Sequence, residues 1–148
     1  MPQPTMVQPP ERVDVIIDTP RFSLLKRRDD GSIEFVSPLP CPFNYGSVPD
    51  SLAADGDRID ALVLGARLLR GARVNRPVRG IVRFIDAGME DPKWICAERP
   101  LRAFDRMQID AFFRIYALVK RAHSRLRGQH SVTRYDGLWL RDASDRAS

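Results

Sequence analysis

Long hydrophobic runs are missing from this sequence of 148 residues. No apolar stretch approaches the roughly 20 residues that a membrane-spanning helix needs. The Pro- and Gln-rich stretch 1–10 has no hydrophobic segment of the signal-peptide kind. We therefore expect a cytosolic protein that does not enter a membrane.

Cysteine and histidine are also scarce, with two of each. Cys41 and Cys96 lie far apart and show no Cys-x-x-Cys spacing, which favours reduced thiols over a disulfide or a zinc site. His123 and His130 have no partner at metal-ligand spacing. These scarcities argue against a disulfide framework and against a site built on soft ligands.

A block of basic residues is absent although the formal net charge is +5 and the pI is about 9.8. The arginines are spread along the chain, and no RNP, zinc-finger or helix-turn-helix pattern is visible. We do not expect nucleic-acid binding as the main function. Ordinary solvated surface charge or a small substrate that carries phosphate accounts for the basic balance equally well.

The composition predicts one folded domain over 13–148, because 43% of the residues are hydrophobic and the chain is long enough to bury a core. Prolines in the stretch 1–12 prevent regular hydrogen bonding and indicate a flexible arm. Prolines also predict a stiff loop over 37–44, and the Gly- and Arg-rich stretch 70–77 reads as a connection.

Several β-branched or apolar runs between these breaks are typical of strands. The turn residues Asp30-Gly31 indicate a hairpin between two of them. The predicted strands cover 13–18, 22–26, 33–36, 61–65, 78–85 and 94–97.

One long helix is predicted after residue 105. Asp105 and Gln108 form a start that resembles a capping box, and Gly128 makes a plausible end. Apolar side chains recur at spacings of three and four on one face, which we expect to pack on the sheet. They are Ile109, Phe112, Phe113, Tyr116 and Val119.

Three carboxylates crowd one short segment at Asp55, Asp57 and Asp60. Two like charges about 4 Å apart repel by roughly 4 kcal/mol at an effective dielectric constant of about 20, so such a cluster favours a bound cation. Oxygen ligands point to a hard ion such as Mg²⁺, Ca²⁺ or Mn²⁺. An EF-hand is excluded, because Ile59 and Ala66 stand where its loop needs ligands. A solvated turn is the alternative reading.

A second acidic segment, with Asp86, Glu90 and Asp91, follows the apolar run 81–85. Taken alone, such residues are turn and cap residues more often than ligands. Two clusters that each adjoin a predicted strand can nevertheless face one site.

Three segments in this order resemble the soluble family I inorganic pyrophosphatases. They are Asn44-Tyr45-Gly46, then Asp55-Gly-Asp57-Arg-Ile-Asp60, then Asp86-Ala-Gly-Met-Glu90-Asp91-Pro-Lys93. The resemblance runs from about Val13 to about Trp139, although Arg58 stands where the family usually has proline.

The resemblance implies a fold, an activity and a cofactor. The implied fold is a small antiparallel β-barrel of the OB-like kind with a long helix packed outside, an α+β protein. The implied activity is hydrolysis of pyrophosphate to two phosphates, with Mg²⁺ as the cofactor and Mn²⁺ as the alternative ion. The family also implies a homo-oligomer, namely a hexamer.

Site residues follow from the same resemblance, position by position. Asp57 would orient or deprotonate the attacking water. The metal ligands would be Asp55, Asp60 and Asp91 for the tighter ion, Asp60 as a bridge to a second ion, and Asp86, Asp91 and the shorter Asp18 on the substrate side. The phosphate contacts would be Lys26, Tyr45, Lys93 and Tyr116.

Two phosphate-binding cations of the family are missing from the matching positions. Ser37-Pro38 stands where an arginine is expected, and Ala117 replaces a lysine after Tyr116. Candidates to replace them are Arg27, Arg28 and Lys120. The alternative function is therefore a diverged homologue whose catalysis is weak, directed to another phosphoanhydride, or lost in favour of phosphate-ligand binding or interaction.

Overall fold

The structure of the chain, a computed structural model, describes residues 8–23, 41–51, 56–128 and 132–141, with the backbone of residues 25–27 and 33–36. Several predicted features lie outside these residues. They are the turn at Asp30-Gly31, most of the N-terminal arm, Arg28, Asp55, His130 and the side chain of Lys26.

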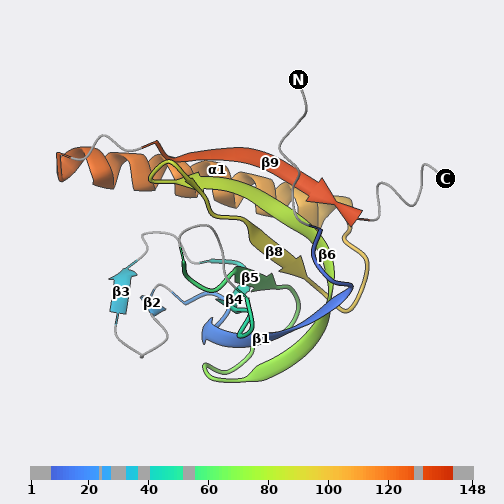
Figure 1. The fold of residues 1–148 in the computed structure, drawn as a ribbon. Coiled ribbons are helices and arrows are strands. Elements are labelled where there is room, and N and C mark those ends of the chain that lie inside the picture. The colour runs from blue at the N-terminus through green and yellow to red at the C-terminus, as the bar shows by residue number, and fades with distance from the viewer. Residues whose placement is uncertain are drawn as a thin grey trace.

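Seven strands form one sheet that closes on itself as a barrel (Figure 1). Six strands follow in the order β1-β4-β5-β8-β6-β7, and the seventh, β9, pairs with β6. The ring closes because β1 also pairs with β6. The strands are β1 (Arg12–Thr19), β4 (Asn44–Ser47), β5 (Asp60–Val63), β6 (Arg73–Asp86), β7 (Met89–Glu90), β8 (Lys93–Cys96) and β9 (Arg134–Leu140). A separate hairpin joins β2 (Leu25–Arg27) to β3 (Ile33–Val36).

The barrel is antiparallel except for the pairing of β5 with β8. The long helix α1 (Ala103–Leu126) lies along its outside, beside β6 and β9 (Figure 1). This arrangement confirms the predicted small barrel with an external helix.

Strand β6 is the element that closes the barrel. Its first half pairs with β1, from Arg73 opposite Ile16 to Pro77 opposite Arg12, and its second half pairs with β8 and β9. A Cβ atom at Gly80 would lie 2.5 Å from the carbonyl oxygen of Trp139, so glycine permits the close approach of β9. The prediction that 70–77 is a connection is wrong from Arg73 onward, because pairing with β1 outweighs the low strand propensity of this stretch.

Strand β4 is not among the strands predicted from the sequence, and its first residue, Asn44, falls in the predicted loop 37–44. The structure makes it a central strand between β1 and β5. Asn44 is fully buried, and its amide donates to the carbonyl oxygens of Val63 and Ala66 at 3.1 and 2.9 Å. A Cβ atom at Gly46 would lie 2.1 Å from the carbonyl oxygen of Ile16. Both residues therefore have a structural reason for their type.

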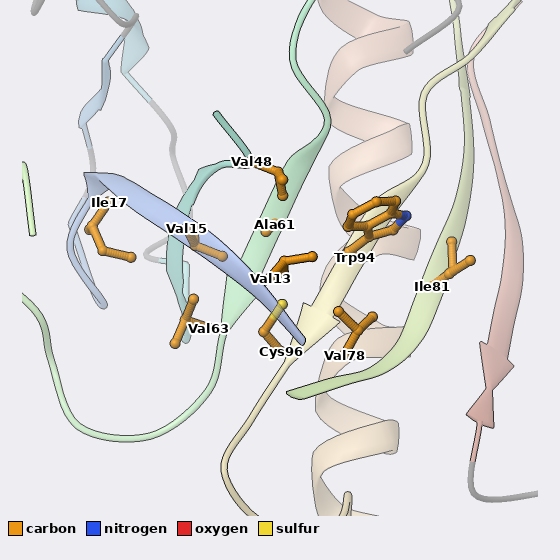
Figure 2. Packing of buried hydrophobic residues seen from close by; sticks show 10 residues of the cluster. All are labelled: Val13, Val15, Ile17, Val48, Ala61, Val63, Val78, Ile81, Trp94 and Cys96. Carbon is orange, nitrogen blue, oxygen red and sulfur yellow. The ribbon is translucent and has the colours of Figure 1, made fainter. Parts of the chain in front are cut away.

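Alternate residues of the barrel strands face two different cores. The first core lies inside the barrel (Figure 2) and contains Val13, Val15, Ile17, Val48, Ala61, Val63, Val78, Ile81, Trp94 and Cys96. The second lies between the barrel and α1, where Leu62 and Ile95 meet Ile109 and Phe113. Burial raises the pKa of the Cys96 thiol to about 12, so this cysteine is protonated at neutral pH.

Helix α1 begins three residues before the predicted start, because its N-cap is Arg102 and not Asp105. Arg102 is the N-cap, and its backbone N–H donates to the Asp105 carboxylate at 2.9 Å, so Asp105 occupies the third helical position. The predicted inner face is buried at Ile109, Phe112 and Phe113, as expected. None of the helices described here is long and apolar enough to cross a membrane.

Candidate active site

A buried lysine links the two acidic segments. The Lys93 side chain is 2% exposed, and its Nζ donates to Asp60 Oδ2 at 2.9 Å and to Asp91 Oδ2 at 2.6 Å. Asp60 comes from the first acidic segment and Asp91 from the second. The tertiary fold therefore brings both segments to one point around a single positive charge.

The parallel pairing of β5 with β8 explains this meeting. Asp60 is the first residue of β5 and lies opposite Lys93, the first residue of β8. Along each strand, side chains at even spacing share a face, so Asp60 lies on the face of Leu62 and Lys93 on the face of Ile95. That face packs against α1. The charged cluster thus lies at the start of two strands, beside the helix.

Lys93 stays charged despite its burial. Burial lowers the pKa of Lys93, but the carboxylates of Asp60 and Asp91 outweigh burial and raise this pKa above its ordinary value. The ammonium also lies 5.6 Å from the centre of the Phe84 ring. A permanent positive charge is therefore held between two carboxylates.

Tyr45 extends the cluster from the neighbouring strand β4. Its hydroxyl donates to Asp60 Oδ2 at 3.0 Å, so this oxygen accepts from both Tyr45 and Lys93. Burial and the nearby Asp60 raise the pKa of Tyr45 well above its ordinary value, which keeps the phenol protonated. Tyr45 is thus a hydrogen-bond donor at all physiological pH values.

Asp86 marks a second end of the cluster, at the last residue of β6. Lys120 Nζ donates to Asp86 Oδ2 at 2.6 Å, and Thr133 Oγ1 donates to Asp86 Oδ1 at 3.2 Å. Partial burial raises the pKa of Asp86, but these hydrogen bonds outweigh burial and the pKa lies below its ordinary value. The positive charge of Lys93 acts on Asp86 in the same direction.

Tyr116 joins the two ends from the helix. Its ring stacks on Phe112 at a centroid distance of 5.9 Å and lies 5.6 Å from the Phe84 ring. The Lys120 ammonium lies 5.6 Å from the centre of the same ring.

The remaining predicted residues are placed less centrally or lie outside the described residues. Asp57 is exposed in the segment before β5, and Asp18 is half-buried near the end of β1. Neither Asp55 nor the side chain of Lys26 is among the described residues. Sequence reasoning missed Thr133 as a partner of Asp86, since no local pattern marks a lone threonine after the helix.

The chemistry of the donor set fits a hard cation. The carboxylate oxygens of Asp60 and Asp91 converge on one positive charge, the ammonium of Lys93. Mg²⁺ prefers carboxylate oxygens as ligands. Within the ranges 8–23, 41–51, 56–128 and 132–141, no group of three or more His, Cys, Asp or Glu side chains converges as a complete metal site. A complete site needs a further carboxylate, and Asp55 is the predicted one.

Comparison with known proteins identifies the family. The family model described as inorganic pyrophosphatase matches residues 16–133. The chain belongs to the inorganic pyrophosphatase family. An inorganic pyrophosphatase of Mesorhizobium japonicum is 30% identical over 94% of this chain and 92% of the relative. One of Brucella melitensis is 35% identical over 62% of this chain and 57% of the relative.

Solved structures of inorganic pyrophosphatases share the fold. The structure from Thermus thermophilus has a TM-score of 0.70 at 27% identity, covering 96% of this chain and 90% of that one. The structure from Helicobacter pylori has a TM-score of 0.71 at 22% identity, covering 92% and 88%. The chain matches little more than half the length of several curated relatives, including 55% for the pyrophosphatase of Gluconobacter oxydans.

Proposed function

We propose that this chain hydrolyses inorganic pyrophosphate to two phosphates in a reaction that depends on Mg²⁺, with Mn²⁺ as an alternative ion. The observation that carries the proposal is the meeting of Asp60 and Asp91 on the buried Lys93, in a member of the inorganic pyrophosphatase family. Relatives that bear this name support the same reaction.

The metal ligands in this proposal are carboxylates from both acidic segments. Asp60 and Asp91 would hold the tighter ion together with Asp55, and Asp18 would hold an ion on the substrate side, where Asp86 also lies. When bound, the ions neutralise the phosphates and lower the pKa of a coordinated water.

Side chains of the chain would supply the base and the contacts to phosphate. Asp57 is exposed, which lets it reach a water molecule and take its proton. Lys93 and Tyr45 present donors next to the carboxylates, where phosphate oxygens would bind. Lys26 and Tyr116 are the further proposed phosphate contacts.

The diverged homologue, in which catalysis is weak, directed to another phosphoanhydride or lost, is the less favoured alternative. Its support is the absence of two cations that the family resemblance implies. Against it stands the retention of Asp60 and Asp91, two of the carboxylates that the resemblance assigns to the metal ion. Family membership points the same way.

A homo-oligomer is the proposed assembly, with α1 as its contact surface. The outer face of α1 exposes a stripe of large apolar side chains, hereafter the outer stripe. It consists of Phe104, Met107, Ile115, Leu118 and Leu126. Their spacing of three, eight, three and eight places them along one side of the helix, and contiguous exposed apolar surface is typical of protein contacts.

A phosphate-release assay tests the proposed reaction. Purified chain is mixed with pyrophosphate, tripolyphosphate or ATP, each with Mg²⁺, with Mn²⁺ and with a chelator. We expect release from pyrophosphate that needs the metal ion and exceeds release from the other two. Equal inactivity on all three substrates with either ion, in a folded protein, rejects the hydrolase.

A further inference from the structure

The pair formed by Lys120 and Asp86 has a geometry that sets it apart from the surface ion pairs of the chain. The two groups lie 2.6 Å apart, and their side chains are 30% and 31% exposed. Asp86 ends β6, whereas Lys120 lies one helical turn after Tyr116 on α1. The pair therefore joins the barrel to the helix at the edge of the charged cluster.

Both oxygens of Asp86 are engaged in this arrangement. Lys120 donates to Oδ2 and the Thr133 hydroxyl donates to Oδ1. A divalent cation that approaches Asp86 meets a carboxylate whose charge is already balanced by an ammonium. The Lys120 ammonium, 2.6 Å from Asp86, repels such a cation and competes with it for the carboxylate.

Lys120 also has the exposure and the donors to bind an anion. An ammonium has three N–H donors, and Asp86 takes one of them. The side chain is held by Asp86 and by the Tyr116 ring, 5.6 Å from the ammonium, while part of it reaches solvent.

We propose that Lys120 is the resident cation of Asp86, which keeps a divalent ion from this carboxylate and supplies the ammonium that binds a phosphate oxygen there. An ammonium thus takes the part of a substrate-side metal ion. This inference rests on the proposed function in that Asp86 and the phosphate site belong to the same cluster. It makes Lys120 a residue that sets both the metal requirement and the phosphate affinity of this chain.

The test measures binding without turnover. Mn²⁺ binding is followed by the electron paramagnetic resonance of free Mn²⁺, and binding of inorganic phosphate by calorimetry. In Lys120→Met we expect Mn²⁺ to bind about tenfold more tightly or at one additional site, because a charge-assisted hydrogen bond no longer opposes it. Phosphate should bind about tenfold more weakly. Opposite shifts of the two ligands separate this role from a structural one, which would weaken both.

Matched variants complete the experiment. Arg73→Met removes an exposed ion pair with Asp14 at the other end of β6 and should change neither constant. In an Asp86→Asn background, Lys120→Met should no longer tighten Mn²⁺ binding. Lys120→Arg keeps the charge and should bind both ligands nearly as the natural chain does. If Lys120→Met does not fold, Lys120→Gln replaces it with the same expectations.

The proposal is overturned if Lys120→Met leaves Mn²⁺ binding unchanged or weakens it, if phosphate binding does not weaken, or if the tightening persists in Asp86→Asn. Because neither readout needs hydrolysis, the two proposals fail separately. Opposite shifts in a chain that does not hydrolyse pyrophosphate would keep the role of Lys120 and reject the proposed reaction.

Discussion

Lys93 lies directly opposite Asp60 in the parallel pairing of β8 with β5, and its ammonium donates to that carboxylate at 2.9 Å. The same ammonium holds Asp91 at 2.6 Å. One buried positive charge thus compensates two negative charges from distant parts of the chain.

Removal of this charge should destabilise the fold. Lys93→Met leaves Asp60 and Asp91 side by side without their counter-ion, so we expect the free energy of unfolding to fall by about 3 kcal/mol or more. Urea denaturation at neutral pH measures it. Arg73→Met, which breaks an exposed pair, should cost less than about 1 kcal/mol. A loss of similar size in both variants would contradict the stabilising role of Lys93.

Alkaline pH should weaken the folded chain through the same residue. The pKa of Lys93 is raised in the folded state, so its contribution is fully present below the unfolded pKa of about 10.4 and is lost as pH rises above that value. Thermal melting between about pH 10 and 12 should show this decline. The raised pKa of Tyr45 also makes stability fall at alkaline pH. This second contribution remains in Lys93→Met, because the variant keeps Tyr45. If the melting temperature of Lys93→Met falls less steeply with pH than that of the natural chain, the difference is the contribution of Lys93. An identical fall in both would refute this contribution.

The proposed base is open to a direct test. Asp57→Asn keeps the size of the side chain but removes the basic carboxylate, so turnover of pyrophosphate should fall about a hundredfold or more. Because Asp57 is exposed, stability should change by less than about 0.5 kcal/mol. Mn²⁺ affinity should also change little. An unchanged turnover number in Asp57→Asn would mean that another group takes the proton from the attacking water.

The outer stripe of α1 predicts how copies associate. Leu118 is 60% exposed near the middle of this stripe, and Leu118→Glu places a charge there. We expect the oligomer to dissociate, as measured by size-exclusion chromatography with light scattering. Arg106→Glu changes an exposed residue off the stripe and should leave the mass unchanged. A monomeric natural chain, or a Leu118→Glu variant of unchanged mass, would rule out this contact surface.

The sequence by itself determined the local features of this protein. The spacing of Ile109, Phe112 and Phe113 predicts which face of the helix is buried, because residues three and four apart in the sequence lie on one face of a helix. The two acidic segments and the motif around Tyr45 are likewise visible in the chain, and the resemblance that they carry agrees with the family.

Only the tertiary structure decided which of these groups meet. The register that sets Asp60 opposite Lys93, and the pairing with β1 that turns 73–77 into strand, depend on contacts between segments far apart in the chain. Ala117 is buried at 3% exposure, whereas Lys120 reaches Asp86, and neither outcome follows from helix position alone. The reason is physical: local propensity sets the direction of a side chain relative to its own element, whereas packing of the barrel against α1 sets what that side chain touches.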